Sequence, residues 1–316
     1  MNHRSSGAPR ALPVVLGLFV AAALAAPVTA ASPAAGRDLN TSAGPAKGLV
    51  LARGASAGRE SQLRGAKPTP NMSYHGGVIM TTANVHPIFW GTSWPSYSGD
   101  KVSGINSFYT GWNVSNYAKT TIEYTGSNGT VGASSTSASA VIDNSAASGG
   151  GSTSAILTEV NKEVNNGAVP LDFSGNGYYP VYTDVPRGSA GYCAWHSSGL
   201  VNGQRVQFAF FFKLDGDAGC DPQDSTTGHS QGLAALANVS GHELAEALTD
   251  PASPGAWYDS RGAENGDKCA WTFNVPSVTF SNGVAWKVQG EWSNHAYSTG
   301  TGYPNSSGQK GCLVGH

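Results

Sequence analysis

The chain has 316 residues and a formal net charge of −2, from 18 lysines and arginines against 20 aspartates and glutamates. Only 12% of its residues are charged and no block of like charges is present, which argues against a nucleic-acid-binding protein. The 42 glycines, 8 tryptophans and 12 tyrosines are typical of an exported protein rich in loops and short strands.

Residues 1–30 have the pattern of a secretory signal peptide. Arg4 and Arg10 precede the apolar run LPVVLGLFVAAALAAPV, and the small residues VTA form a cleavage site ending at Ala30. Cleavage would remove two positive charges and no negative charge, leaving a net charge of −4. No later stretch approaches the about 20 apolar residues that span a bilayer. We therefore expect a secreted, extracellular protein; an uncleaved membrane anchor is the alternative.

Residues 31–70 and residues 71–316 differ in composition. The first stretch has few large apolar residues and no aromatic ones, so we predict a disordered tail or a pro-segment. The second continues without another such linker, which predicts one domain. Within it, the Ser/Gly-rich stretch 125–153 is expected to be a surface insert containing one short strand at 139–143.

The apolar pattern of residues 71–316 predicts a single α+β domain with a mixed sheet. One or two strands are expected within 76–91, and three more at 177–185, 191–198 and 205–214. A helix is predicted after Asp100, and another after Ser152 or Thr153, ending at Asn166-Gly167. Their expected apolar faces comprise Val102, Ile105, Phe108 and Trp112 in the first helix, and Ile156, Val160 and Val164 in the second.

A third helix is predicted from Gln231 to Leu248, where leucines recur at helical spacing. The sequence Thr249-Asp250-Pro251 ends it, because proline cannot continue a helix. Gly241 lies inside this helix and costs about 1 kcal/mol relative to alanine, so packing must hold the helix together.

This third helix carries the most informative motif of the chain, His242-Glu243-x-x-Glu246. His242 and Glu246 lie one turn apart on one face, the spacing at which two side chains can bind a single metal ion. The pattern matches the His-Glu-x-x-His helix of zinc peptidases with glutamate in place of the second histidine, and Zn²⁺ accepts such a carboxylate. The alternative is a set of solvated helix charges, but a helix rich in leucine and alanine is expected to be buried, where acids need a partner.

A third zinc ligand is expected from the acidic stretch that follows the motif. Six of the 20 acidic residues fall between Glu243 and Asp267, and Asp267 or Glu264 would complete the site. We favour Asp267, because a disulfide at Cys269 would hold its backbone still, with the other acid as the acceptor that orients His242. Bound zinc would lower the pKa of its water, and Glu243 would act as general base in peptide-bond hydrolysis.

Four cysteines, all in the exported part, predict two disulfides rather than a metal site, since no Cys-x-x-Cys pair is present. Sequence proximity favours Cys193 with Cys220 and Cys269 with Cys312. Each closed loop is of a length for which about 3 to 4 kcal/mol of stabilisation is expected.

Several other residues are weaker candidates. His196 could be a metal ligand, an orienting residue or an oxyanion donor, against a structural role near a disulfide; Tyr258 and His295 could stabilise an oxyanion if they reach the metal. Four carboxylates in residues 215–224 suggest Ca²⁺, although a solvated turn fits their spacing better. Some aromatic residues could stack on sugars or simply fill the core: Trp94, Trp257, Tyr258, Trp271 and Trp292.

Several short motifs, taken in order, resemble the plant EXORDIUM family, also called phosphate-induced protein 1. They are YHGGVIMT at 74–81, IFWGTSW at 88–94, Cys193-Ala-Trp-His196, GHELAEALTDP at 241–251 followed by AWYD, and Glu264-x-x-Asp267-x-Cys269. The resemblance covers most of residues 74–316 and implies a secreted protein linked in plants to growth and nutrient responses, without implying an activity. The chain departs from the family in its Ser/Gly-rich insert and its smaller number of cysteines.

Two functions compete on this reading. The first is a secreted zinc-dependent metallopeptidase that acts on a peptide or protein substrate and is held inactive by residues 31–70. The second is a non-catalytic extracellular protein in which the acidic cluster holds a structural ion and aromatic loops bind a cell-wall polymer or a surface partner. An open metal position in a cleft facing Glu243 would distinguish the peptidase from the second class.

Overall fold

The computed structural model describes residues 43–55, 70–273 and 275–315 of the chain. The expected signal peptide (1–30) lies outside the described residues, as do 31–42 and 56–69 of the expected tail. All described residues belong to one compact unit that runs from Asp38 to His316. Among them, no helix combines the length and the apolar character needed to cross a membrane.

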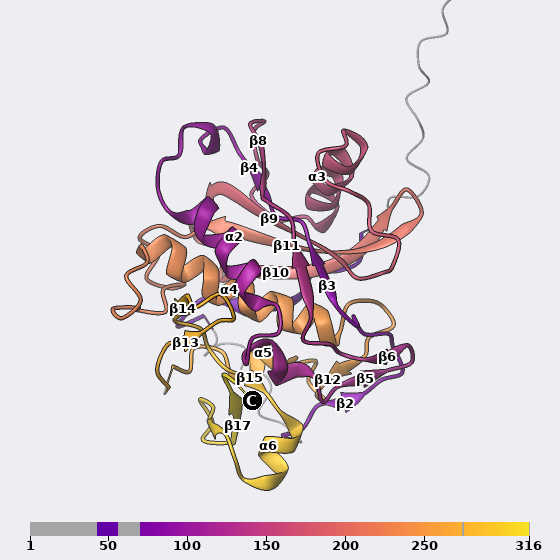
Figure 1. Cartoon of the computed structure of the whole chain (residues 1–316), viewed down its shortest axis with the longest axis vertical. Coiled ribbons are helices and arrows are strands. Elements are labelled where there is room, and N and C mark those ends of the chain that lie inside the picture. The colour runs from indigo at the N-terminus through magenta and orange to yellow at the C-terminus, as the bar shows by residue number, and fades with distance from the viewer. Residues whose placement is uncertain (1–42, 56–69, 274, 316) are drawn as a thin grey trace, which may run out of the picture. The chain divides into compact units, whose positions relative to one another are not determined.

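An eight-stranded mixed sheet forms the centre of the described chain (Figure 1). Its strands are β1 (Lys47–Leu51), β3 (Ala83–Val85), β4 (Ile88–Trp90), β7 (Ser135–Ser137), β8 (Val141–Asp143), β9 (Gly177–Pro186), β10 (Tyr192–Val201) and β11 (Gln204–Lys213). Strands β1, β10 and β11 are antiparallel neighbours, and β11 pairs with β9 in parallel. Beyond β9 lie β3 and β4, which pair in parallel with β7 and β8. The predicted α+β class with a mixed sheet is confirmed.

The strands β9, β10 and β11 are buried on both faces, which explains their nearly continuous apolar sequences. Neighbouring residues of β10 face opposite sides of the sheet. The Trp195 indole donates to the Gly150 carbonyl, next to the start of α3 (Thr153–Asn165), whereas His196 faces α4 (Gln231–Thr249). The sheet therefore separates the two helices and turns His196 toward the helix that carries the metal-binding motif.

Helix α4 matches its predicted bounds and is held by packing, as its internal glycine requires. It packs beside α2 (Lys101–Trp112). A Cβ atom at Gly241 would lie 3.1 Å from the Tyr117 hydroxyl and 3.5 Å from the Phe108 ring. Glycine thus permits a close approach of aromatic side chains that alanine would crowd.

The helix starts agree with the predictions except for the role of Asp100. Asp100 precedes α2, but its carboxylate accepts hydrogen bonds from the amide and hydroxyl of Ser230, the N-cap residue of α4. Ser152 rather than Thr153 caps α3, since its side chain accepts from the Ala155 amide. Asp100 therefore ties the two helices together and does not cap its own helix.

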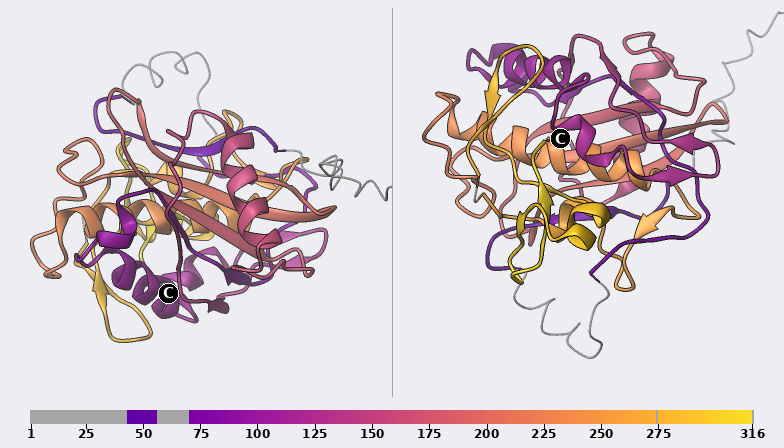
Figure 2. Two further views of the ribbon diagram at one scale, coloured as in Figure 1. Left: turned by 90° about the horizontal axis from the view of Figure 1, so that it is seen from above. Right: turned by 60° about the horizontal axis from the view of Figure 1, so that its bottom comes forward.

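The remaining described elements are short. The helices are α5 (Asn265–Lys268) and α6 (Asn294–Thr299), with 3-10 turns η1 (Trp94–Ser96) and η2 (Ala118–Thr121). The short strands are β2 (Ser73–Tyr74), β5 (Thr125–Gly126), β6 (Gly129–Thr130), β12 (Trp257–Tyr258), β13 (Val278–Thr279), β14 (Ala285–Trp286), β15 (Glu291–Trp292), β16 (Tyr303–Pro304) and β17 (Lys310–Leu313). Figure 2 shows α6 beside the small sheet of β15, β17 and β16.

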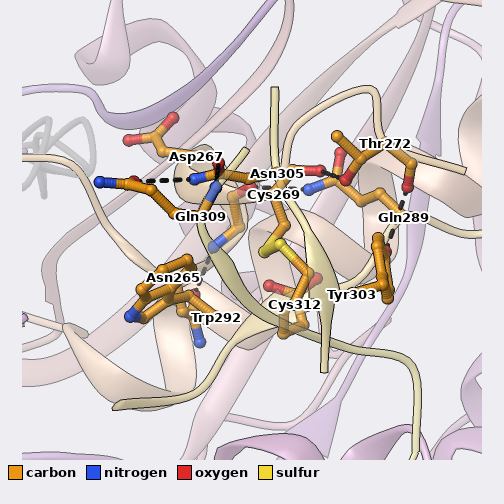
Figure 3. The surroundings of a disulfide bond; sticks show 12 residues. Asn265, Asp267, Cys269, Thr272, Gln289, Trp292, Tyr303, Asn305, Gln309 and Cys312 are labelled. Carbon is orange, nitrogen blue, oxygen red and sulfur yellow. Dashed lines mark hydrogen bonds between the residues drawn. A yellow bond between two sulfur atoms is a disulfide. The ribbon is translucent and has the colours of Figure 1, made fainter. Parts of the chain in front are cut away.

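Both predicted disulfides are confirmed, Cys193–Cys220 and Cys269–Cys312. The second links the end of α5 to β17 (Figure 3). Beside it, the Tyr303 hydroxyl donates to the Thr272 carbonyl at 3.1 Å. The backbone that presents Asp267 is thus tied to the last strand of the chain, as the preference for Asp267 assumed.

Two sequence predictions are wrong in part. Residues 43–55 belong to the stretch expected to be a disordered tail or a pro-segment, and only the disordered alternative is wrong for them, because β1 lies within them and forms an edge of the main sheet beside β10 (Figure 2). The Ser/Gly-rich stretch 125–153 holds four short strands rather than one, and β7 and β8 join the main sheet. In both places, pairing with a neighbouring strand outweighs weak local propensity.

Candidate metal centre

Helix α4 buries the three acidic and basic side chains of its motif completely. His242, Glu243 and Glu246 are each 0% exposed. His242 Nε2 lies 3.0 Å from Glu246 Oε1, as expected for residues one helical turn apart. Solvated helix charges, the alternative weighed from the sequence, are therefore excluded. Three buried ionisable groups on one helix need a partner or an ion.

Residues from β10 and α5 surround these side chains. His196 Nε2, from β10, lies 3.7 Å from Glu246 Oε2 and 3.0 Å from Glu264 Oε2, while Asp267 Oδ1 lies 3.8 Å from His242 Nε2. The amide of Asp267 donates to Glu246 Oε1 at 2.9 Å. Distant parts of the sequence thus converge on Glu246.

Glu246 is shared by two groups of possible metal ligands. In one group, ligand atoms of His242, Glu246 and Asp267 lie within 4.8 Å of one another, and in the other the same holds for His196, Glu243 and Glu246. Oε1 of Glu246 is the oxygen close to His242, and Oε2 is the oxygen close to His196. Imidazole nitrogens combined with carboxylate oxygens are the donor set that Zn²⁺ accepts.

Several atoms of this cluster have no hydrogen-bond partner among the described residues. They are His196 Nδ1, His242 Nε2, both oxygens of Glu243, and Glu246 Oε2. The 3.0 Å contact of His242 Nε2 with Glu246 is short, but its geometry is not that of a hydrogen bond. Buried polar atoms almost always have a hydrogen-bond partner. These unpaired nitrogen and oxygen atoms could instead be ligands of a bound cation.

Burial disfavours charged side chains in this cluster, and the carboxylates repel one another, as the pKa values show. Burial, together with the charge of Glu246, raises the pKa of Glu243 and of Glu264 well above the usual range. Burial also lowers the pKa of His196 to about 4. Burial would lower the pKa of His242 as well, but the charges of Glu246 and Asp267 outweigh it and raise this pKa to about 9. A divalent cation would relieve the repulsion among these carboxylates.

Gln289 positions His242; the prediction that Glu264 does so is wrong. The Gln289 amide nitrogen lies 3.0 Å from His242 Nδ1 and donates to the Gly266 carbonyl at 2.8 Å. Glu264 instead contacts His196. These contacts hold the His242 ring in the orientation that places its Nε2 beside Glu246 Oε1.

Strand β1 covers the cluster. A Cβ atom at Gly48 would lie 1.8 Å from Glu246 Oε2 and 2.8 Å from His196 Nε2. The Val50 amide is close enough to Glu243 to favour its ionised form, although the contact does not meet hydrogen-bond geometry. Lys47 donates to Asp250 Oδ2 at 2.8 Å. The buried state of the centre therefore depends in part on β1.

A second acidic cluster, on the opposite face of the sheet, already has its cation. Carboxylates of Asp143, Glu159 and Glu163 come within 4.8 Å of one another. The Lys162 ammonium donates to Glu159 at 2.7 Å and to Asp143, and lies 3.5 Å from Glu163. This cluster is therefore an ion-pair network rather than a metal-site candidate.

The other predicted site residues lie elsewhere. The Tyr258 ring stacks on His75 with centroids 3.7 Å apart, and the amide of the exposed residue His295 donates to Glu123. Neither residue belongs to the described metal-ligand groups. Trp94 and Trp292 are buried in the core, which favours a packing role for them over sugar stacking.

The four carboxylates of residues 215–224, where Ca²⁺ was considered, bind other groups of the protein. Asp215 accepts from Lys101, and Asp217 forms an ion pair with Arg187. Asp221 and Asp224 accept backbone amides of their own turns. No described group of metal ligands falls in residues 215–224.

Sequence reasoning missed Gln289, Glu291 and Gly48. Glu291 is fully buried, accepts from the Tyr117 hydroxyl at 2.8 Å, and has its pKa raised well above the usual range by burial. No motif surrounds these residues, so only the folded chain reveals them. The one available signal was Lys47-Gly48 beside an apolar run in an otherwise polar tail.

Comparisons with protein-family models, with curated proteins and with solved structures find no match. The resemblance to the EXORDIUM family therefore stays a prediction based on the motifs quoted above. What the chain does has to be inferred from the geometry of the centre itself.

Proposed function

We propose that this chain is a secreted zinc-dependent hydrolase, a zincin-like metallopeptidase that cleaves peptide bonds. The observation that carries the proposal is the set of unpaired, fully buried ligand atoms around Glu246 on α4. Two disulfides are compatible with export to an oxidising compartment. We also propose, from the motifs, that the chain is a secreted member of the EXORDIUM family.

Zinc fits the residues present. His242, Glu246 and Asp267 would hold it, and it would supply a Lewis acid that activates water near neutral pH. Asp267 is the most exposed of the three, with 28% of its side chain accessible. The fit is chemical, because two carboxylates and one imidazole match the donor preferences of zinc.

Glu243 is the residue we assign to proton transfer. It follows His242 directly and lies near Glu246 with both oxygens unpaired among the described residues. Its raised pKa, caused by burial and by Glu246, gives its carboxylate a high proton affinity, which suits a group that takes a proton from attacking water and delivers it to the leaving amine. Gln289 and Glu264 would keep the two histidine rings in place.

The second candidate function is a non-catalytic extracellular protein with a structural ion, which binds a cell-wall polymer or a surface partner. One observation favours it: the centre is enclosed, with His242, Glu243 and Glu246 all 0% exposed. A structural metal is fully enclosed, whereas a catalytic one keeps a position open to substrate. The peptidase proposal therefore requires that the cover over the centre can leave.

Two variants compared side by side test the proposal. Glu243→Gln keeps the size of the side chain and should retain zinc while cleavage of a denatured protein substrate falls by about 10²- to 10⁴-fold. His242→Ala should lose both zinc and cleavage. Cleavage that is equal in the wild type and in Glu243→Gln, and insensitive to a chelator, would rule out the mechanism.

A further inference from the structure

We propose that β1 occupies the position of a peptide substrate and that an extended peptide with a basic residue followed by glycine takes its place. The catalytic part of this inference rests on the proposed function, whereas the exchange of strands does not. In this arrangement β1 is the segment that blocks the enclosed centre, and the substrates are extended peptides with a basic residue followed by glycine.

The first support is the contact between Gly48 and the centre. The space for a side chain at this position is filled by Glu246 Oε2, 1.8 Å from an ideal Cβ, and by the His196 ring. Gly48 also has φ +51°, a conformation that side chains other than glycine rarely adopt. The backbone of β1 thus approaches the ligand atoms as closely as a bound peptide must.

The second support is the place of β1 in the sheet. It is an edge strand whose one partner among the described strands is β10, with which it pairs antiparallel, so its removal would expose the backbone groups of β10. The register is irregular between Lys47, opposite His196, and Val50, opposite Ala194. From Lys47 to Val50 the chain advances by three residues, while its partner β10 advances by two, from His196 to Ala194. The extra residue forms a β-bulge at Gly48 and Leu49, beside the centre. Addition of a strand to such an edge is a common way of binding extended peptides.

The third support is how β1 is held. Side chains around residues 44–51 donate to carbonyl groups of β1 and of the residues just before it: Ser197 to Pro45, Thr153 to Gly44 and Trp271 to Leu51. Such contacts accept many sequences, because every residue has a carbonyl group.

Lys47 is the exception among these contacts. Its ammonium group donates to Asp250 Oδ2 and to the Ala252 carbonyl, each at 2.8 Å, and the Asp250 side chain is only 2% exposed. A buried carboxylate in this position selects a basic side chain. Lys47 and Gly48 therefore define the sequence preference, a basic residue followed by glycine.

The test separates strand exchange from catalysis. Part of residues 56–69 in the full mature chain is replaced by the recognition sequence of a specific protease, and the folded protein is then cut. A fluorescent peptide with the sequence of residues 43–55 is added, and its binding is followed by anisotropy. We expect the peptide to bind the cut chain and not the uncut chain, in which the tethered strand competes at high effective concentration.

Peptide variants identify the determinants. Lys47→Ala should weaken binding at least about tenfold, because Asp250 is left buried without its partner. Gly48→Ala and Gly54→Ala both place alanine at a positive φ, but nothing lies within 4 Å of a Cβ at Gly54. The ratio of their affinities therefore measures the cost of the steric clash between a Cβ atom at position 48 and the side chains of Glu246 and His196. We expect Gly48→Ala to bind at least about tenfold more weakly than Gly54→Ala.

Cleavage of quenched peptides then links exchange to activity. The cut chain, washed free of β1, should cleave a Lys-Gly peptide at least about tenfold faster than the uncut chain and faster than a matched Glu-Gly peptide. Absence of peptide exchange, or equal binding of all three variants, would overturn the inference. Zinc- and Glu243-dependent cleavage at the same rate by uncut and cut chains would also overturn it, while leaving the proposed function intact. Sequence-dependent exchange without cleavage would support the strand site and count against the peptidase.

Discussion

Replacement of Glu243 by methionine should stabilise the metal-free protein. The side chain is fully buried and neither oxygen has a hydrogen-bond partner among the described residues. Burial and the charge of Glu246 raise the pKa of Glu243 well above the usual range, which favours its neutral, protonated form in the metal-free protein. An unpaired, buried polar group of this kind costs about 1 to 3 kcal/mol. Methionine has a similar volume and removes that cost.

We therefore expect Glu243→Met to raise the free energy of unfolding by about 1 to 3 kcal/mol, or the midpoint of thermal unfolding by about 2 to 6 °C. The assay is thermal unfolding in the presence of a chelator. Glu159→Met is the matched control: Glu159 is 3% exposed, but Lys162 donates to it at 2.7 Å. This control should gain less stability than Glu243→Met, because it also removes a partner of Lys162.

Zinc should stabilise the wild type and Glu243→Met alike, by about 2.7 kcal/mol at a concentration 100 times its Kd, because the expected ligands are intact in both. If Glu243→Met gains no more stability than Glu159→Met, then Glu243 has a stabilising partner. In that case the interpretation of the centre as a set of unpaired ligands would be wrong.

Three further outcomes follow from the structure. Gln289→Ala should weaken zinc binding about 10- to 100-fold in a calorimetric titration, since the carboxamide orients His242. Loss of the Cys269–Cys312 disulfide by replacement of both residues with serine should cost about 2 to 5 kcal/mol of stability, measured by urea unfolding. The pKa of Asp143 is lowered to about 2 against burial, by Lys162 and local hydrogen bonds. Its stabilising contribution of about 1 to 2 kcal/mol should therefore be present above pH 4 and disappear as the pH falls toward 2, where wild type and Asp143→Asn should unfold alike.

Much of the fold could be predicted because its signals are local. The repeating leucines and Pro251 define α4, and the even number of cysteines and their proximity in sequence predict the disulfide pairs. The strands β9, β10 and β11 are long and apolar enough to be recognised without their partners. The motif itself was also visible, because His242 and Glu246 are close in sequence as well as in space.

The remainder depends on contacts between distant residues. β1 has only five residues in a polar stretch, and its pairing with β10 joins positions about 150 residues apart, such as Lys47 and His196. Gln289 reaches His242 from 47 residues away, with no motif around it. Ser135–Ser137 has little strand propensity and becomes β7 through its pairing with β3. Single-sequence patterns cannot show such pairings, because their energy comes from the partner.

Zinc titration of the chelator-stripped chain, measured by calorimetry, tests the central claim most directly. The geometry of His242, Glu246 and Asp267 predicts about one zinc ion per chain for the wild type. Binding should be lost in His242→Ala and retained in His295→Ala, whose histidine is exposed and lies outside the metal-ligand groups. A wild-type chain that binds no zinc, or that binds as much as His242→Ala does, would contradict the claim.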